Sequence, residues 1–217
     1  MYPLVSVITP TANRREFFPR SVRCFLSQNY PDMEWIVLDD GSDPIKDLLP
    51  EDPRIRYFYE PPARNHGQKM NRCMELAQGE YAIVWDDDDW YAPNRVSNQI
   101  VPMIATPDIQ ITGTSQLYYV LHGTQRCFHY VNKTDLIWIG AIAFRKSAWA
   151  SRQFNDKSHG ADYDFMTQIP KSQWLDLADR TLLVSTIHDN NAAPKRVPAP
   201  WWVEQPWETV QAIMGEQ

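Results

Sequence analysis

Four consecutive aspartates follow a short apolar run in this sequence, in the stretch YAIVWDDDDW that spans residues 81–90. At a separation of about 4 Å, two like charges repel by about 1 kcal/mol in water and by about 4 kcal/mol near a protein surface. A folded chain therefore holds Asp86 to Asp89 beside a core strand only with a counter-charge, unless the run is a solvated acidic turn. The sequence thus raises the question of what neutralises these carboxylates.

Two other apolar runs also end in side chains that can bind a ligand. Asp39 and Asp40 end the run MEWIVLDD, and Thr9, Pro10 and Thr11 end the run LVSVITPT. In an open α/β sheet, ligands bind outside the carboxyl ends of the strands. Carboxylate oxygens at that edge suit a hard divalent cation, with the remaining positions taken by water and phosphate oxygens. The pattern predicts a Mg²⁺ or Mn²⁺ ion between protein carboxylates and a diphosphate, although Asp39 alone could simply cap a turn through Gly41.

The elements that must position these residues alternate between strands and helices over residues 1–105. We expect strands at 4–9, 33–40, 54–60 and 81–85, and helices at 66–80 and 93–104, with a further helix from Pro19. Asn13 is the expected N-cap of a loose turn before Pro19, and Gly79 the expected end of the second helix. Such alternation predicts a parallel sheet that is covered by helices on both faces.

The pattern changes after residue 105. We expect two strands within 116–131 around a turn at His122-Gly123, further strands at 137–145 and 180–188, and a helix start within 160–169. A proline- and tryptophan-rich C-terminal tail, residues 191–217, ends in a short helix. We therefore predict one domain over residues 1–190, divided at residue 105, with the tail attached to it.

Composition excludes several classes of function. With 217 residues, 43% of them hydrophobic and 22% charged, the chain has the composition of a soluble globular protein. A net charge of -6 provides no basic field for nucleic acid. No apolar run approaches the ~18 residues of a membrane span, and the first residues lack a signal-peptide pattern, so we expect a cytoplasmic protein. Cys24, Cys73 and Cys127 match neither a disulfide framework nor a zinc motif, so we expect buried, reduced thiols.

The order and spacing of several motifs carry a resemblance over roughly residues 4 to 190. The motifs are VSVITPTANR, VLDDGSD, the Asn71 helix followed by GEYAIVWDDDDWYAPNRV, then GADYDF and IHDNN. Together they resemble the family 2 glycosyltransferases of the GT-A fold. The resemblance implies a Rossmann-like, mostly parallel central sheet flanked by helices, with a small mixed β region for the acceptor. It also implies transfer of a sugar from a nucleotide diphosphate, usually a UDP-sugar, to an acceptor hydroxyl with Mn²⁺ or Mg²⁺.

The resemblance further implies roles for single residues in donor and metal binding. Asp40 matches the aspartate that reads the base, with Asp39 beside the ribose, and Lys69 lies where the diphosphate is expected. Asp86 and Asp88 match the acids of the DXD motif, Asp87 lies between them near the ribose, and Asp89 points toward the fold. The expected donor-binding residues are Pro10, Thr11, Asp39, Asp40, Lys69, Asp86 and Asp87, and the expected metal-binding residues are Asp86, Asp88 and His188. Residues 1–105 then form the nucleotide-sugar half, and residues 106–190 form the acceptor half.

The expected catalytic residue is Asp162, which matches the base of inverting members of the family. It would take the proton of the acceptor hydroxyl, while the metal offsets the charge of the leaving diphosphate. Asp162 could instead be a helix N-cap, and His188 a surface histidine. Trp201 and Trp202 could stack on an acceptor sugar or fasten the tail to the core. Ala12 and Ala161 depart from the family pattern, where an aromatic residue and a glutamate are usual.

Alternatives of other classes stay open at this stage. A sugar nucleotidyltransferase also uses acidic strand ends and a metal, but it needs a glycine-rich loop after its first strand, and TPTANRRE contains no glycine. A catalytically inactive binder of sugar nucleotides or carbohydrate is the other alternative. The acceptor can be a glycan, a lipid carrier, a protein or a modified base, and a retaining outcome depends on where that acceptor lies. Without a membrane span, we expect a soluble transferase that adds single residues.

Overall fold

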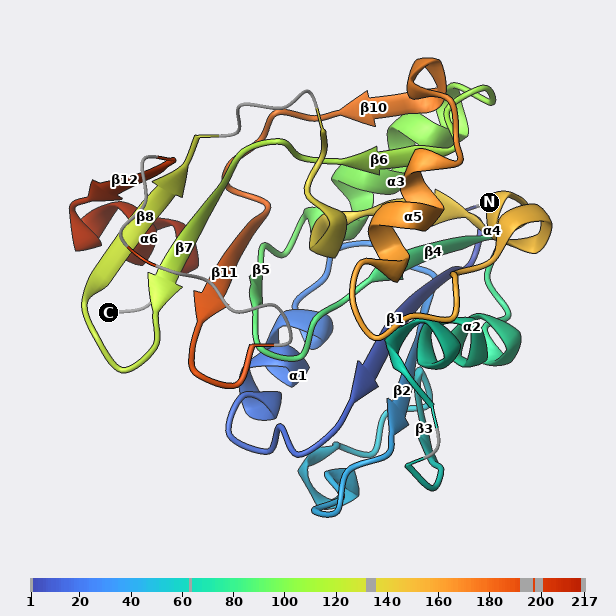
Figure 1. Cartoon of the computed structure of the whole chain (residues 1–217), viewed down its shortest axis with the longest axis horizontal. Coiled ribbons are helices and arrows are strands. Elements are labelled where there is room, and N and C mark those ends of the chain that lie inside the picture. Colours follow the sequence, from blue (N-terminus) through green and yellow to red (C-terminus); the bar gives the residue numbers. More distant parts are fainter. Residues whose placement is uncertain (1, 63, 132–135, 192–196, 198–200, 216–217) are drawn as a thin grey trace.

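The computed structural model describes residues 2–62, 64–131, 136–191, 197 and 201–215 (Figure 1). Within these residues the central feature is a seven-stranded sheet in the order β10-β6-β9-β4-β1-β2-β3. The strands are β1 Val5–Thr11, β2 Met33–Asp39, β3 Ile55–Tyr59, β4 Tyr81–Val84, β6 Ile111–Gly113, β9 Ala143–Arg145 and β10 Trp174–Asp176. Strands β3, β2, β1 and β4 are parallel neighbours, whereas β9 runs antiparallel to both β4 and β6. The predicted α/β fold with a mostly parallel central sheet is confirmed.

Helices cover both faces of this sheet. Helices α1 Phe18–Leu26 and α3 Arg95–Ala105 share one buried cluster with the sheet, and α2 His66–Leu76, α4 Lys146–Arg152 and α5 Ala161–Thr167 share the other. On β2, Trp35 and Val37 belong to the first cluster, and Ile36 and Leu38 belong to the second. Because successive side chains of a strand point to opposite faces, a strand buried on both sides is apolar throughout. This burial explains the continuous apolar runs in the sequence.

A second sheet has five strands among the described residues, in the order β12-β8-β7-β11-β5. Its strands are β5 Trp90–Tyr91, β7 Leu117–Leu121, β8 Arg126–Tyr130, β11 Leu183–Ile187 and β12 Trp202–Gln205. The predicted hairpin within 116–131 is confirmed, and Gly123 in its turn has a φ of 72°, which favours glycine. The described residues also form the α-helix α6 Trp207–Met214 and three single-turn 3-10 helices, η1 Lys46–Leu48, η2 Ile139–Ala141 and η3 Lys171–Gln173.

The C-terminal tail is part of this second sheet. Strand β12 pairs antiparallel with β8, and α6 packs beside it with Val210 fully buried (Figure 1). The Trp202 ring lies 4.4 Å from the Tyr119 ring and 5.4 Å from the Tyr130 ring, measured between centroids. Trp202 therefore fastens the tail to the core, whereas Trp201 is 44% exposed.

Two predicted helix boundaries are wrong. Asn13 does not cap a helix: its φ is 57°, and its side chain accepts hydrogen bonds from Ser42 Oγ and Asp43 N. Helix α1 begins at Phe18, so the predicted start at Pro19 is confirmed to within one residue. Helix α2 ends at Leu76 rather than at Gly79.

Gly79 serves a packing role instead. A Cβ atom there would lie 2.7 Å from Leu4 O, so only glycine lets the chain pass this close to the start of β1. The backbone N–H of Gly79 donates to Ser6 Oγ and to the buried carboxylate of Glu34, which also accepts from Ser6 Oγ, Gln78 N and Arg56. Glu34, itself on β2, thus fastens the end of α2 to β1 and β2.

Other sequence predictions have mixed outcomes. The expected strand at 137–145 is shorter, because η2 Ile139–Ala141 interrupts it and only β9 remains. The three cysteines are buried free thiols, as expected. Among the residues that the structure describes, no helix combines the length and the apolar character needed to span a membrane.

Candidate active site

The acidic turn, Asp86–Asp89, directly follows β4 at the centre of the seven-stranded sheet. Asp86, Asp88 and Asp89 each place one carboxylate oxygen within 4.8 Å of the other two. Oxygen ligands this close together fit a hard divalent cation. Burial, followed by the charges of Asp89 and Asp88, raises the pKa of Asp86 well above its usual range. A bound cation would favour the charged form of Asp86, so the donor set fits the Mn²⁺ or Mg²⁺ ion expected from the sequence.

Asp87 and Asp89 are the more buried members of the acidic turn. Thr11 Oγ1 donates to Asp87 Oδ2 over 2.5 Å, which joins the ends of β1 and β4. Burial, and then the charge of Asp88, raises the pKa of Asp87 to about 7. Asp89 accepts from Ser185 Oγ and from Thr186 N on β11, so it points toward the fold, as predicted.

His188 follows β11 and lies against Asp88. Its Nε2 is 2.8 Å from Asp88 Oδ2, and its Nδ1 accepts from Asn190 N over 3.2 Å. Since a backbone N–H can only donate, Nδ1 is unprotonated and Nε2 carries the proton that it donates to Asp88. Phe17 stacks on the ring at 4.4 Å between centroids. The structure thus places His188 beside a predicted metal ligand, where it orients Asp88; its own metal contact stays a prediction.

The carboxyl end of β2 lies next to that of β1. Thr11 and Asp39 are register partners, and Pro10 is opposite Leu38. Asp39 is fully buried and accepts from Gly41 N, Ile45 N and the Tyr57 hydroxyl. The turn-capping interpretation of Asp39 is therefore confirmed, and a donor contact by the same carboxylate stays a prediction.

Asp40 and Lys69, both predicted to bind the donor, form an ion pair with each other. Lys69 Nζ on α2 is 2.7 Å from Asp40 Oδ1, and the two side chains are 16% and 9% exposed. Asn65 caps this helix with Gln68 in a capping box that the sequence reading missed, which fixes the first turn beside Asp40. The charge of Lys69 is thus directed at Asp40 rather than at the acidic turn.

Asp162 lies in the first turn of α5, beside the acidic turn. The N-cap of this helix is Gly160, with a φ of 74°, and Asp162, two residues later, accepts from the adjacent Tyr163 N over 3.0 Å. The N-cap interpretation of Asp162 is therefore wrong. The Asp162 charge contributes, after burial, Asp89 and Asp88, to the raised pKa of Asp86. It also acts on His66 at the start of α2, although burial lowers the pKa of that histidine overall.

Two arginines after β1 and a glycine in η2 lie at the site in addition to the residues predicted from the sequence. Arg14 lies between Asp87 and His188, and Arg20 donates to Asp88 O and to Thr186 Oγ1. The basic residues in TANRREFFPR were a signal for a counter-charge to the acidic turn.

Gly140 in η2 had no such sequence signal. A Cβ atom at this position would lie 2.7 Å from Asp86 Oδ2, so the lack of a side chain keeps that carboxylate uncovered on this side.

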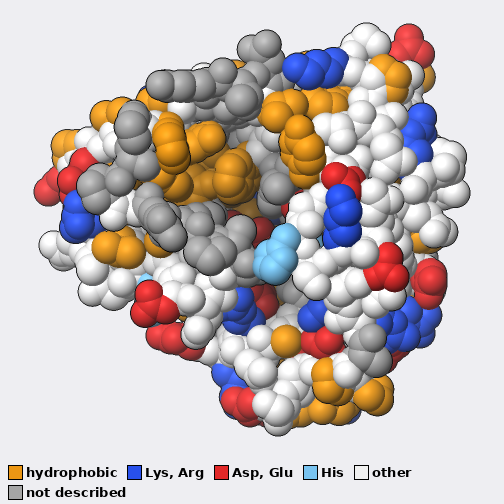
Figure 2. All heavy atoms as spheres, viewed as in Figure 1, with side chains coloured by type: hydrophobic (Ala, Val, Ile, Leu, Met, Phe, Trp, Pro, Cys, Tyr) orange, Lys and Arg blue, Asp and Glu red, His pale blue; other side chains and the backbone are white. Residues whose placement is uncertain are grey.

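Charged side chains gather around a hollow on one face of the molecule. In the view of Figure 1, Figure 2 shows a hollow near the centre of the face where acidic and basic side chains lie close together beside a histidine.

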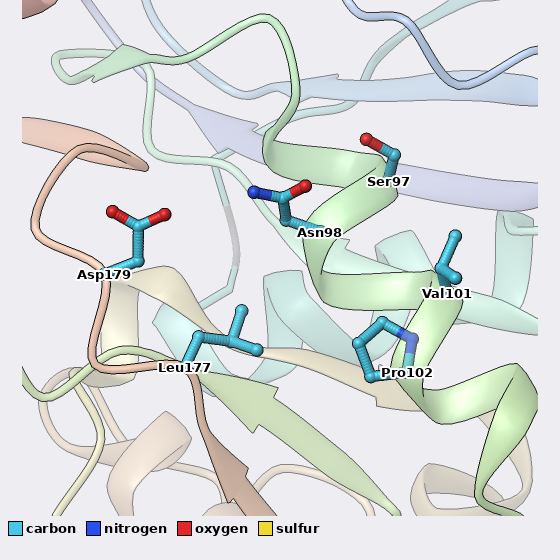
Figure 3. Close-up of a pocket in the computed structure, with 6 residues that line it drawn as sticks. All are labelled: Ser97, Asn98, Val101, Pro102, Leu177 and Asp179. Atoms are coloured by element: carbon cyan, nitrogen blue, oxygen red, sulfur yellow. The ribbon is translucent and has the colours of Figure 1, made fainter.

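A separate pocket of about 400 Å³ lies between α3 and the chain after β10 (Figure 3). Its lining residues are Ser97, Asn98, Val101, Pro102, Leu177 and Asp179. None of the predicted site residues lines this second pocket.

Sequence comparisons agree on one family. Residues 6–135 match the model of Glycosyl transferase family 2. A putative colanic acid biosynthesis glycosyl transferase of Escherichia coli, WcaA, is 37% identical over 100 residues, which is 44% of this chain and 36% of that protein. A putative teichuronic acid biosynthesis glycosyltransferase of Bacillus subtilis, TuaG, is 35% identical over 103 residues, which is 45% of this chain and 41% of that protein. The match thus spans less than half the length of either relative.

Solved structures resemble the fold over most of the chain. The mannosyltransferase PcManGT of Pyrobaculum calidifontis, in complex with GDP-Man and Mn²⁺, has a TM-score of 0.69 at 18% identity, covering 91% of this chain and 59% of that one. TarS of S. aureus (residues 1–349), in complex with UDP-GlcNAc, has a TM-score of 0.69 at 15% identity, covering 87% of this chain and 60% of that one. At these identities the likeness concerns the fold, and it matches the GT-A architecture expected from the sequence.

Proposed function

Because the chain belongs to glycosyl transferase family 2, we propose that it transfers a sugar from a nucleotide diphosphate to an acceptor hydroxyl. The observation that carries this proposal is the group of three carboxylates, Asp86, Asp88 and Asp89, within 4.8 Å of one another after the central strand. This edge of the sheet is where an open α/β fold binds its ligands. The donor class is supported by two structural neighbours that bind GDP-Man and UDP-GlcNAc.

The donor lies across the carboxyl ends of β1, β2 and β4 in this proposal. Asp40 and Lys69 bind the nucleoside end, and Asp87 with Thr11 lies near the ribose. We take uridine as the nucleoside of the donor, with guanosine as the alternative. Residues 1–105 form the donor half of the domain, and residues 106–190 with the tail form the acceptor half.

Asp86 and Asp88 would hold the divalent cation, and His188 would join them by giving up its hydrogen bond to Asp88. When bound, Mn²⁺ or Mg²⁺ supplies positive charge that offsets the negative charge growing on the leaving diphosphate. The hydrogen bond from His188 keeps the Asp88 carboxylate in one orientation before the cation arrives. Asp89 anchors the acidic turn to β11 by accepting hydrogen bonds from Ser185 Oγ and Thr186 N.

Asp162 is the proposed general base. It accepts the proton of the acceptor hydroxyl as that oxygen attacks the anomeric carbon from the face opposite the diphosphate. The sugar configuration inverts, since the new bond forms on the face opposite the one that breaks. The raised pKa of Asp86, to which burial contributes most and Asp162 adds, supports this placement next to the acidic turn.

A panel of sugar nucleotides tests the proposal. The purified chain is incubated with UDP-glucose, UDP-galactose, UDP-GlcNAc and GDP-mannose, with Mn²⁺ or with EDTA, and nucleotide release is measured. We expect release from at least one donor, and we expect EDTA to abolish it. Binding of a nucleotide diphosphate without release under any condition would favour the inactive binder. The absence of both binding and release would contradict the proposed function.

A further inference from the structure

Arg14 connects the acidic turn to the segment after β11. Its Nε is 3.9 Å from Asp87 Oδ1, its Nη1 is 3.5 Å from His188 Nε2, and its Nη2 donates to Asn190 O over 2.5 Å. The Arg14 side chain is 16% exposed, so the guanidinium is largely shielded but still reachable from solvent. It therefore provides positive charge at the point where four carboxylates follow one strand.

The guanidinium has hydrogen-bonding capacity to spare. Arginine offers five N–H donors in a planar fork, and an ordinary N–H···O bond measures about 2.7–3.2 Å. The hydrogen bond of Arg14 to Asn190 O is shorter than this range, whereas its contacts with Asp87 Oδ1 and His188 Nε2 are longer than the range. The donors directed at the acidic turn are thus held only loosely by protein groups.

Lys69, Arg20 and Arg15 each make close contacts with protein groups. Lys69, which the sequence reading placed at the diphosphate, pairs with Asp40 over 2.7 Å. Arg20 donates to the backbone of Asp88 and to Thr186 Oγ1, so it holds β11 against the acidic turn. Arg15 points away from the site and pairs with Asp47. Of the basic side chains that the structure describes, Arg14 is the one with contacts to both Asp87 of the acidic turn and His188.

Resting on the proposed donor chemistry, we infer that Arg14 binds the diphosphate of the nucleotide donor. Its planar fork suits two phosphate oxygens at once. In the free protein the same charge offsets the repulsion between Asp87 and its neighbours. When the donor binds, the guanidinium keeps its anchor on Asn190 O and turns its loosely held donors to the phosphate oxygens. Arg14 therefore serves as the counter-charge of the turn before binding and as a donor ligand afterwards.

Replacing Arg14 should affect the affinity for the cation Mn²⁺ and the affinity for the anionic nucleotide differently. Arg14→Gln removes a positive charge beside the carboxylates, so Mn²⁺ alone should bind as tightly as to the parent protein or more tightly. The same variant loses a charge-assisted contact to phosphate, so UDP and GDP, measured with Mn²⁺ present, should bind about tenfold more weakly or worse. A role limited to holding the fold would weaken the binding of both probes.

Two further variants sharpen the experiment. Arg15→Gln is the matched control, because Arg15 is the next residue and its described partners are Pro44 O, Asp43 and Asp47. Its affinities for Mn²⁺ and UDP should equal those of the parent. Arg14→Lys keeps the charge but loses the fork, so it should recover part of the UDP affinity that the glutamine variant loses. It also provides the measurement if Arg14→Gln fails to fold, which thermal unfolding will reveal.

Isothermal titration calorimetry measures Mn²⁺, UDP and GDP affinities for the parent and the three variants. Weaker nucleotide binding together with undiminished Mn²⁺ binding in Arg14→Gln supports the inference. Unchanged nucleotide binding, or a parallel loss of Mn²⁺ and nucleotide affinity in both Arg14 variants, overturns it. A parent that binds neither UDP nor GDP overturns the proposed function instead, and the inference falls with it.

Discussion

Replacing Asp162 with asparagine separates binding from chemistry. Asparagine keeps the size and shape of the side chain but cannot accept the proton of the acceptor hydroxyl. We expect turnover to fall by about 10²–10⁴-fold, the usual contribution of a positioned base. At 1.36 kcal/mol for each factor of ten, this corresponds to about 3–5 kcal/mol of activation free energy. Donor affinity should stay close to that of the parent, because the proposed role of Asp162 is toward the acceptor and not toward the diphosphate.

The structure limits how much stability this change can cost. Asp162 lies in the first turn of α5, where a negative charge gains about 0.3–1 kcal/mol from the helix dipole. Gly160 holds the N-cap position, and Asp162 Oδ1 accepts from the neighbouring Tyr163 N over 3.0 Å, a bond that the asparagine Oδ1 can also accept. A loss of up to about 1 kcal/mol lowers the melting temperature of a chain of this size by about 2–4 °C. The variant should therefore remain folded at the temperature of the assay.

Asp164 provides a matched control in the same helical turn. Both aspartates are in the first turn of α5, but Asp164 pairs with Lys157 and accepts from Asn155 Nδ2 over 3.0 Å. Asp164→Asn should lose at least as much stability and keep turnover within a few-fold of the parent. The comparison thus removes the effect of the helix dipole from the effect on chemistry.

Nucleotide release at saturating donor, with the acceptor or with water in its place, gives turnover, and calorimetry gives donor affinity. Near-parent turnover in Asp162→Asn would refute its role as the base. If Asp164→Asn lost turnover instead, Asp164 would be the base. A large fall in donor affinity in Asp162→Asn would show that this carboxylate binds the donor and would contradict the assignment to the acceptor side.

Three further predictions follow from the same geometry. Asp88→Asn should abolish Mn²⁺-dependent donor binding in calorimetry without lowering the melting temperature, because it removes a ligand charge and relieves repulsion; Asp189→Asn, an exposed neighbour of His188, should bind as the parent does. Gly140→Ala should weaken Mn²⁺ binding at least several-fold while the fold is retained, because the new Cβ would lie 2.7 Å from a carboxylate oxygen of the acidic turn; parent-like affinity would show that this approach is not used. Burial works against the charge of Glu34, but its hydrogen bonds outweigh burial and lower its pKa from the ordinary 4.5. The ionised Glu34 therefore stabilises the folded protein above pH 4.5, and this contribution is lost as the pH falls through the lowered pKa. Urea unfolding should show Glu34→Gln to be less stable by about 1–3 kcal/mol at pH 7 and less sensitive to acid, and equal acid sensitivity in both proteins would contradict this account.

The sequence by itself determined the central layer and the general place of the site. A strand buried on both faces must be apolar throughout, so β1, β2 and β4 could be recognised in the sequence as continuous apolar runs. The carboxyl ends of parallel strands lie at one edge, so the acidic residues after β2 and β4 predicted a binding edge without knowledge of the strand order. These are local signals, because they depend on the side-chain pattern within each strand.

Only the tertiary structure decided which side chains meet at that edge. Asp88 and His188 are 100 residues apart in the chain, and they touch because β11 pairs with β5 directly after the acidic turn. No local pattern encodes that pairing, since it depends on how the second sheet packs against the first. The same holds for Gly140, whose need to lack a side chain arises from Asp86 in a distant segment.

The distribution of charge was likewise decided by packing. The sequence placed Lys69 at the diphosphate and left Asp39 open between two roles, whereas the fold pairs Lys69 with Asp40 and buries Asp39 in its own turn. The counter-charge to the four carboxylates comes in part from Arg14, beside Asp87. A long, flexible side chain can reach many partners, so composition shows that a counter-charge exists, but only the packed chain determines which residue supplies it.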